Sequence, residues 1–599
     1  MPPAKEQDYQ IWSKEELVRE IERLRKRKKY GLVWEDKPEG VVEQCKKELP
    51  VLEELKEKEI ITDPTKPMNL FIEGDNYHAL SVLNYTHKGK IDVIYIDPPY
   101  NTENKDFKYN DCWVDKNDAY RHSKWVSFMN RRLRLAKSLL KDDGAVFISI
   151  NEEELAQLKL LCDEVFGEAN YLTTFTIKVR HEDRILKGDK DFHEVVEYLL
   201  LYRRTEAFKP LKRKRDNTSI DDYVYEIKEL SKHHKMRLGN KSVDVFKPGE
   251  YAMVKGDPGE TKLKKISIRG SIKEGNSSGR FYVKFIAPVF NNKNGCLIKV
   301  PDMGGDQFNH RYFLTPVSKN RRNGDYFQGV PVAREDVIEF PFPNFCDFEE
   351  DFNNVGYEGG VDFRNGKKPV IFIQKMLEIA NCLSKPKAII LDYFAGSGST
   401  AHAVLDYNRQ CGGVRQFIIC TNNEVDEKAE KLLGTKGTKR GNAEYEKEGI
   451  ARKICYPRIK NVIYGYSDPR GHKHARLGGN LKYFRTAFVS AEPTDRNKEK
   501  LTKKATDMLC IRENTFERVK DTDLFKIFRN QTHYTGIVFD QLAIPEFKRA
   551  IAKIAGKFSV YIFSLSDDTF DEEFEDLKGK VTLSPIPEAI VRVYRRIFK

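Results

Sequence analysis

The sequence predicts an α/β fold that is interrupted by a long insert and followed by an α+β domain. Two apolar runs, Ile91–Ile96 and Ala388–Tyr393, have the length and continuity of strands buried on both faces of a parallel sheet. Helical periodicity adjoins each run, and this alternation of helix and strand stops between about residues 203 and 365. We therefore expect a Rossmann-like core assembled from two separated halves.

Length and composition set the limits of this interpretation. The chain has 599 residues, which at roughly 100–200 residues per domain predicts several domains. Hydrophobic residues make up 40% and aromatic residues 11%, so wholesale disorder is excluded. The formal charge of +13 fits either simple solubility or a phosphate-rich partner, and composition alone does not separate the two.

Membrane and metal functions find no support in the sequence. No window approaches the ~18 apolar residues of a membrane span, and the first nine residues lack the apolar core of a signal peptide. The ten cysteines include no CxxC spacing. We therefore expect a cytosolic protein with reduced thiols and no metal site.

The first half contains the elements of an α/β unit. Residues 13–29 predict a charged helix with a Ser13–Glu16 capping box, for which a solvated arm is favoured over a DNA-contacting one. The elements expected after it are a turn at 74–76 and a short helix, the strand 91–96, a helix at 125–140, a turn at 142–144, a strand at 145–150 and a helix at 152–166.

The remainder predicts an insert, the second α/β half and a tail. The insert is expected to be largely irregular and β. The second half predicts a helix at 370–383, strands at 388–393 and 416–421, and a helix at 399–408; strands at 526–528, 536–539 and 558–563 follow in the tail. The expected domains are an N-terminal helical arm (1–64), the first α/β half (65–204), the insert (205–365), the second α/β half (366–475) and a C-terminal α+β domain (476–599).

The tetrapeptide Asp97-Pro98-Pro99-Tyr100 stands at the carboxyl end of a buried strand, where open α/β sheets place their ligands. Two prolines stiffen the loop and remove two donors, so that it presents carbonyls and a carboxylate. If Asp97 and the Pro98 carbonyl each accept one N–H of an exocyclic amino group, the nitrogen lone pair can face an electrophile. Tyr100 would stack on an extruded base. The alternative is an ordinary turn that ends a strand.

A glycine-rich turn follows the second predicted strand. It reads Asp392-Tyr393-Phe394-Ala395-Gly396-Ser397-Gly398-Ser399-Thr400 and leads into a helix, whose amino terminus favours a negative group. Gly396 and Gly398 also satisfy a dinucleotide fingerprint, so the turn alone does not distinguish a nicotinamide cofactor from another adenosyl cofactor.

Together, these motifs resemble the amino-group DNA methyltransferases that use S-adenosylmethionine, in the permuted β arrangement in which DPPY precedes FxGxG. From about residue 65 to the end, the chain further resembles the modification subunits of type III restriction-modification systems. The stretches that carry this resemblance include Ile94–Thr102 (IYIDPPYNT), Leu391–Ala403 (LDYFAGSGSTAHA), Phe417–Glu424 (FIICTNNE) and Gly478–Phe484 (GGNLKYF).

The resemblance implies a protein of the bacterial or archaeal cytosol that associates with the nucleoid. It makes 65–204 the catalytic half, 205–365 a target-recognition domain, 366–475 the cofactor half and 476–599 a domain for dimer or partner contact. It also implies roles for individual residues. The catalytic loop would be Asp97, Pro98, Pro99 and Tyr100. The cofactor residues would be Asp75, Lys368, Asp392, Phe394, Ala395, Gly396, Ser397, Gly398, Thr400 and Glu424. Phe107 is the candidate for closing the base pocket, but it also suits the core. Two of the cofactor roles have alternatives as well. Asp75 also suits an Asx turn, and Thr421 or Asn423 could bind the ribose as well as Glu424.

In the insert and its flanks, basic residues interleave with aromatic ones, as in surfaces that position phosphates and read base edges. The candidate DNA-binding residues are Arg203, Arg204, Lys212, Arg213, Lys214, Arg215, Arg321 and Arg322.

The resemblance implies methylation of N6 of adenine in double-stranded DNA, a homodimer and a separate restriction subunit with helicase and nuclease activity, since no GxxxxGK[ST] loop is present in this chain. The alternatives are N4-cytosine or RNA methylation, a non-catalytic DNA-specificity subunit and a nicotinamide-dependent enzyme. Asp rather than Ser at position 97 favours adenine.

Overall fold

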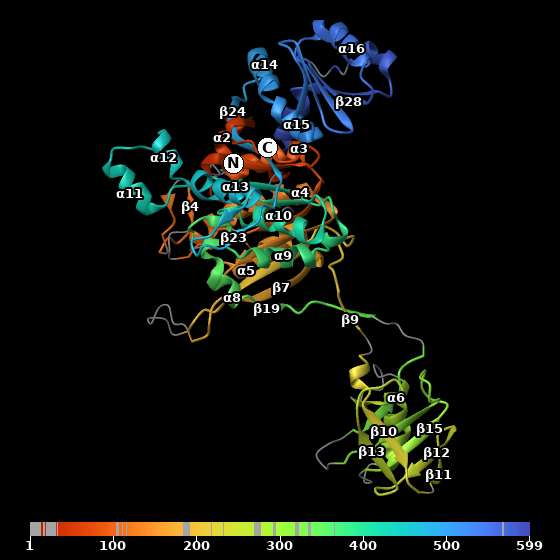
Figure 1. Cartoon of the computed structure of the whole chain (residues 1–599). Coiled ribbons are helices and arrows are strands. Elements are labelled where there is room, and N and C mark those ends of the chain that lie inside the picture. The colour runs from red at the N-terminus through yellow and green to blue at the C-terminus, as the bar shows by residue number, and fades with distance from the viewer. Residues whose placement is uncertain are drawn as a thin grey trace. The chain divides into compact units, whose positions relative to one another are not determined.

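The chain forms two compact units in the computed structural model (Figure 1). One comprises Met1–Leu211 and Pro343–Lys599, and the other comprises Lys212–Phe342. The structure describes residues 13–15, 18, 32, 34–102, 107–110, 112–115, 117–183, 192–216, 219–231, 233–268, 277–290, 295–317, 323–332, 337–363, 366–565, 568 and 570–598. Most of the helix predicted at 13–29 lies outside these residues, as do Arg321 and Arg322.

A mixed sheet of ten strands organises the first unit. In sheet order the strands are β1 (Glu48–Glu54), β24 (Asn480–Ser490), β2 (Met68–Glu73), β21 (Gln416–Thr421), β20 (Ile389–Asp392), β3 (Ile91–Ile96), β6 (Leu140–Ile150), β8 (Val196–Arg203), β7 (Tyr171–Lys178) and β19 (Phe345–Asp347). From β24 to β6 neighbouring strands are parallel, whereas β8 is antiparallel to both of its neighbours. The two halves of the chain thus interleave in one sheet, which confirms the predicted Rossmann-like α/β core.

Helices cover both faces of this sheet, because its central strands are apolar on both sides. Side chains of one face, such as Ile94 and Leu391, share a buried cluster with Leu80, Met129 and Leu158. On the other face Tyr95 packs edge-on against Phe372, with ring centroids 6.2 Å apart. The helices of the first face are α3 (Asn76–Thr86), α4 (Arg121–Leu139) and α5 (Leu155–Phe166); α9 (Val370–Ile379), α10 (Ser399–Cys411) and α13 (Tyr456–Tyr464) pack together in a second group.

One local prediction needs correction. The turn expected at 142–144 lies within β6. In the pairing of β6 with β3, Leu140 lies opposite Ile91 and Ala145 lies opposite Val93, so β6 contributes extra residues between these two pairs. The extra residues leave the ladder without ending the strand. The insert, expected to be largely irregular and β, contains a six-stranded sheet, which agrees with the β part of the prediction.

The second unit is built around that sheet. Its strands, in sheet order, are β11 (His234–Leu238), β12 (Lys241–Phe246), β15 (Leu297–Pro301), β16 (His310–Leu314), β17 (Asp325–Gln328) and β14 (Lys264–Ser267), with β10 (Tyr225–Glu229) and β13 (Tyr251–Lys255) forming a separate pair. Helices α6 (Ser277–Phe281) and α7 (Ala287–Phe290) flank a π-helical turn, Tyr282–Ile286. Phe281, Phe313 and Ile298 meet in the core of this unit.

The C-terminal residues belong to the first unit. Strand β24 runs between β1 and β2, so residues 480–490 are part of the large sheet. A five-stranded sheet follows, made of β25 (Glu517–Asp521), β26 (Phe525–Arg529), β27 (His533–Val538), β28 (Lys557–Phe563) and β29 (Val581–Ile586). Its helices are α14 (Asp495–Lys504), α15 (Thr506–Glu513), α16 (Ile544–Ala552) and α17 (Glu588–Ile597).

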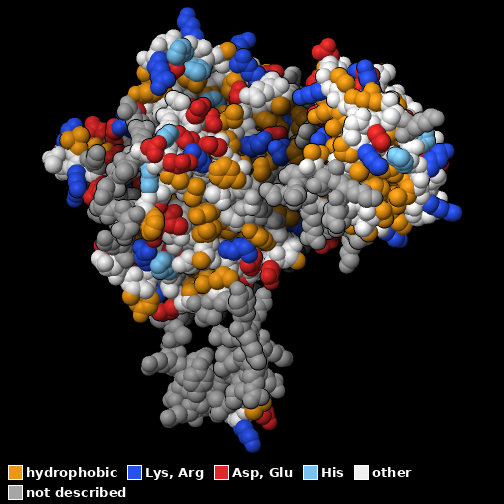
Figure 2. Space-filling model, turned by 90° about the horizontal axis from the view of Figure 1, so that it is seen from below, with side chains coloured by type: hydrophobic (Ala, Val, Ile, Leu, Met, Phe, Trp, Pro, Cys, Tyr) orange, Lys and Arg blue, Asp and Glu red, His pale blue; other side chains and the backbone are white. Residues whose placement is uncertain are grey.

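The remaining elements are short. They are α2 (Gly40–Lys47), α8 (Glu349–Asn354), α11 (Glu427–Thr435), α12 (Ala443–Lys447), and the strand pairs β4 (Lys108–Tyr109) with β5 (Cys112–Trp113), β9 (Arg213–Asp216) with β18 (Val337–Phe340) and β22 (Tyr466–Ser467) with β23 (Lys473–His474). In the part of the chain that the structure describes, no helix is long and apolar enough to cross a membrane. Basic and acidic side chains are interspersed on the face drawn in Figure 2.

Candidate active site

Three sequence motifs converge at one edge of the large sheet. Strand β20 pairs in parallel with β3 on one side and with β21 on the other. Because parallel neighbours end at the same edge, the loops that begin at Asp97, Tyr393 and Asn422 lie next to one another. The sheet therefore brings together the two halves that the insert separates in the sequence.

Hydrogen bonds hold the carboxyl-terminal side of the loop Asp97-Pro98-Pro99-Tyr100. The indole Nε1 of the buried Trp125 donates to the Pro99 carbonyl at 2.7 Å. Beyond the loop, Asn101 adopts a positive φ of 59° and donates to the buried Glu154 carboxylate at 2.6 Å. Among the described residues, no donor bonds the Pro98 carbonyl oxygen. The role of this carbonyl as an acceptor for an amino group stays a prediction.

The Asp97 carboxylate lies in a cluster of charged groups. The Tyr100 hydroxyl donates to Asp97 Oδ1 at 2.7 Å, and Lys368 Nζ lies 3.2 Å from the same oxygen. Burial raises the pKa of Asp97, an effect that Lys368 opposes and the nearby Glu197 reinforces. The sequence predicted Lys368 for the cofactor, whereas here its ammonium contacts the catalytic loop. Glu197 was not predicted at all.

The glycine-rich turn supplies backbone that another molecule can approach. Gly396 has φ +49°, and among the described residues the nearest atom to a Cβ added there is the Phe394 carbonyl oxygen at 3.9 Å. Gly398 has φ +80°, and a Cβ there would come within 2.9 Å of Cys455 Sγ. Gly396 therefore leaves open space on the turn, whereas Gly398 permits close packing behind it.

Asp392 and Thr400 hold the glycine-rich turn together. Asp392 accepts hydrogen bonds from the Phe394 amide at 2.9 Å and from the Thr400 hydroxyl at 2.5 Å. Burial raises the pKa of Asp392 to about 7. Both side chains were predicted to bind the cofactor, and in the structure they bond each other and the turn.

A buried arginine supports the turn from below. Arg458 donates to Ser397 Oγ at 3.1 Å and to Ser399 Oγ at 2.7 Å, and its other nitrogen pairs with Glu358 at 3.1 Å. Neither Arg458 nor Glu358 was predicted from the sequence. Arg458 lies on α13 with its neighbours Ile459 and Val462 in the core, so the only signal was an arginine on an apolar helix face.

Aromatic rings connect the two halves beside the turn. The Phe394 and Phe128 ring centroids lie 5.9 Å apart, and Phe107 meets Phe128 edge-on at 5.2 Å. Phe107 is 1% exposed. In this structure the residue proposed to close the base pocket is a core side chain.

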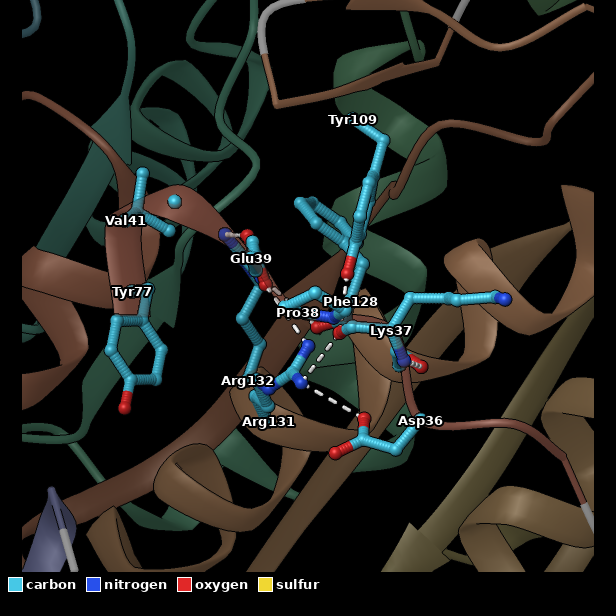
Figure 3. A network of polar contacts seen from close by, with 12 residues as sticks. Asp36, Lys37, Pro38, Glu39, Val41, Tyr77, Tyr109, Phe128, Arg131 and Arg132 are labelled. Carbon is cyan, nitrogen blue, oxygen red and sulfur yellow. Dashed lines mark hydrogen bonds and ion pairs between the residues drawn. The ribbon is translucent and has the colours of Figure 1, made fainter. Parts of the chain in front are cut away.

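Asp75 begins helix α3 and also belongs to a buried ion network. Its carboxylate accepts from the Tyr77 amide at 2.7 Å, which caps the helix as the Asx alternative expects. Arg132 approaches it at 3.3 Å and donates to both oxygens of Glu39, at 2.6 and 3.0 Å. Figure 3 shows Arg131 and Arg132 directed at residues 36–39, the segment just before α2.

The network reaches the glycine-rich turn. Asn76 accepts a short hydrogen bond from Arg132 and donates to the Tyr393 carbonyl at 3.1 Å. The fully buried Arg132 thus links the start of α3 to the residue that precedes Phe394. Asp75, whose side chain is 30% exposed, keeps access to solvent at this edge.

The three candidates for the ribose role differ in their environment. Thr421 is buried, and Asn423 donates to the Glu446 carbonyl at 2.7 Å. Glu424 is partly exposed and forms an ion pair with Lys108 at 2.5 Å. Glu424 is thus the charged and accessible member of the three.

The predicted DNA-binding residues are divided between the two units. Arg203 donates to the Ala169 carbonyl and, with Arg204, belongs to the first unit at the end of β8. Lys212, Arg213 and Lys214 are exposed at the start of the second unit, where β9 pairs with β18; the Arg213 guanidinium lies over the Phe340 ring at 4.5 Å. The side chain of Arg215 and all of Arg321 and Arg322 lie outside the described residues.

A metal centre has no ligand set here. In the described ranges, no group of three or more His, Cys, Asp or Glu side chains is placed to hold a metal ion.

Comparison with known proteins places these motifs in a protein family. The profile described as DNA methylase matches residues 91–425, more than half of the chain, including the catalytic loop, the insert and the glycine-rich turn.

Several curated proteins are similar over about 60% of the chain. A probable type III restriction-modification HindVI Mod subunit from Haemophilus influenzae is 31% identical over 407 residues, 63% of this chain and 52% of that protein. The StyLTI Mod subunit from Salmonella typhimurium is 29% identical, covering 60% of this chain and 54% of its own. The type II methyltransferase M.KpnI of Klebsiella pneumoniae is 29% identical, with shares of 58% and 79%. The chain spans about half the length of the two type III relatives.

Among solved structures, this chain is similar to the PvuII cytosine-N4-specific DNA methyltransferase and to the M1.HpyAVI–SAM complex. Their TM-scores are 0.29 and 0.27 at 11% and 10% identity. They cover 67% and 59% of this chain, and 97% and 94% of their own.

Proposed function

The chain belongs to the DNA methylase family, and from that premise we propose that it transfers a methyl group from S-adenosylmethionine to N6 of an adenine extruded from double-stranded DNA. The observation that carries this proposal is the pairing of β3 with β20, which sets the acceptor loop at Asp97 beside the open turn at Gly396. The two partners of a methyl transfer would meet at that edge.

The residues present fit S-adenosylmethionine. The open backbone at Gly396 suits a closely approaching ligand, and Asp75 and Glu424 are accessible carboxylates for its ammonium group and its ribose hydroxyls. When bound, the cofactor supplies an electrophilic methyl group, which takes the lone pair of the target nitrogen while the sulfur leaves as a thioether.

The chain's own groups then orient the target amino group. Asp97 and the Pro98 carbonyl each accept one N–H, which turns the nitrogen lone pair away from the ring and toward the methyl group. Tyr100 stacks on the extruded base. The proton released by the methylated nitrogen passes to the Asp97 carboxylate, whose raised pKa favours its uptake, and from there to water.

Adenine is the proposed target because position 97 carries Asp rather than Ser. The alternative is N4 of cytosine, which presents the same kind of amino group. The similarity to type III Mod subunits further supports a role as the modification and recognition subunit of such a system, as a homodimer with a restriction subunit. In this proposal the unit Lys212–Phe342 recognises the target sequence.

Methyl incorporation tests the activity. The 599-residue chain, tritiated S-adenosylmethionine and genomic DNA from a host without adenine methylation should give labelled DNA, and Asp97→Ala should lose more than 100-fold of the rate. Asp523→Ala, which removes an exposed carboxylate in the C-terminal sheet, is the matched control and should retain full activity. Equal labelling by wild type and Asp97→Ala would refute the assignment of Asp97.

A further inference from the structure

A lysine lies between two carboxylates at the catalytic loop. Lys368, which precedes α9, lies 3.2 Å from Asp97 Oδ1 and 3.0 Å from Glu197 Oε2. Glu197 extends from β8, a strand of the first half, so the cluster joins both halves of the chain. All three side chains are less than 20% exposed, which makes their charges interact strongly.

The Tyr100 hydroxyl completes the cluster. It accepts a hydrogen bond from Lys368 Nζ at 2.8 Å, and its oxygen lies 2.7 Å from Asp97 and 3.1 Å from Glu197. A tyrosine has one hydroxyl proton to donate. The hydroxyl can therefore donate to only one of Asp97 and Glu197 at a time, whereas the lysine ammonium, with three N–H donors, lies within reach of both carboxylates and of the hydroxyl.

We propose that Glu197 is a positioning residue that retains Lys368 and the Tyr100 hydroxyl when the target base arrives, so that the Asp97 carboxylate is released to accept the amino N–H. This inference rests on the proposed methyl transfer. Without Glu197, Asp97 would be the remaining carboxylate partner of Lys368 in the cluster. The lysine ammonium would then bind Asp97 Oδ1, the acceptor that the amino group of the base requires.

The electrostatics of the cluster agree with this division of roles. Burial raises the pKa of Asp97, and Glu197 adds to this effect. Burial would also raise the pKa of Glu197, but the Lys368 ammonium holds it below its usual value. Glu197 is therefore the firmly ionised partner of the lysine, whereas Asp97 takes up a proton more readily.

Other ionisable groups contribute to the field at this site. Tyr95 on β3 and Asp392 on β20 interact with Asp97, and Arg180 interacts with Glu197. A change that removes only the charge of Glu197 leaves these groups in place. Asp97 then loses a negative neighbour, and its pKa falls.

Glu197→Gln makes that change with little change of shape. The expected result is a kcat at least tenfold below wild type, with the dissociation constant of S-adenosylmethionine within twofold. The acidic limb of the pH–rate profile should move to lower pH, because the activity requires ionised Asp97. A kcat and an acidic limb equal to those of wild type would overturn the inference.

A second variant separates positioning from packing. Adding Lys368→Gln to Glu197→Gln removes the competitor for Asp97, so the double variant should be at least threefold more active than Glu197→Gln alone. A double variant no more active than the single one would contradict the proposed competition. Loss of packing would not be rescued in this way.

The control is Glu513→Gln. Glu513 likewise accepts a tyrosine hydroxyl, from Tyr561 at 2.7 Å, but lies on α15 against the C-terminal sheet. It should keep wild-type kcat and pH dependence. The assay is tritium transfer to the DNA used above: no transfer by wild type would refute the proposed function itself, whereas an active wild type with an unaffected Glu197→Gln would refute only this inference.

Discussion

Gly396→Ala tests whether the open turn is where a ligand approaches. The backbone strain of a non-glycine residue at positive φ costs about 1–2 kcal/mol, and the described residues leave room for the added methyl group. Stability should therefore fall by that amount and no more. If the cofactor lies against this backbone, the methyl group blocks it, and the affinity for S-adenosylmethionine should fall at least tenfold, which is about 1.4 kcal/mol.

Gly89→Ala provides the matched control. Gly89 has φ +66°, has no described atom within 4 Å of its added Cβ, and precedes β3 at the opposite edge of the sheet from the candidate site. Calorimetric titration with S-adenosylmethionine and thermal unfolding without it should show similar losses of stability for both variants, with weakened binding only for Gly396→Ala. If Gly396→Ala binds as tightly as Gly89→Ala, the turn does not contact the cofactor.

Three further predictions concern other parts of the molecule. Burial raises the folded-state pKa of Asp392 to about 7 from an ordinary value near 3.8, so the wild type loses stability as the pH rises through this window. Asp392→Asn should remove that loss, which amounts to up to about 4 kcal/mol between urea unfolding at pH 4 and at pH 8. The same pH dependence in the variant and the wild type would contradict this prediction. Arg132→Met leaves the buried Glu39 carboxylate without its main partner and should lower the free energy of unfolding by about 3–5 kcal/mol. Adding Glu39→Gln should recover part of this loss, and additive losses of the two changes would argue against the ion network. Replacing Arg213 and Lys214 with Ala should make the negative slope of log DNA affinity against log salt concentration shallower by about 2. An unchanged slope would exclude both side chains from contact with phosphates.

The sequence predicted those parts of the fold that depend on local patterns. Strands β3 and β21 lie at the residues expected for them, because largely apolar segments of strand length suit strands buried on both faces of a parallel sheet. The insert gave no such pattern. Its strands are short and half polar: β11, for example, has only two apolar residues, Met236 and Leu238, among its five.

The site was predictable only where one motif carries its own chemistry. The acceptor loop and the glycine-rich turn are contiguous in sequence, and their neighbourhood follows from parallel strands ending at one edge. Glu197 and Lys368 are 171 residues apart and meet only through the tertiary structure. Arg458 likewise reaches Ser397 from another element, and neither contact has a signal in spacing.

Modification-sensitive sequencing of DNA from cells that express this chain tests the central claim most directly. The account predicts N6-methyladenine on one strand of one short asymmetric sequence, present with the wild-type chain and absent with Asp97→Ala. No modified adenine with the wild-type chain, or the same modification with Asp97→Ala, would contradict it.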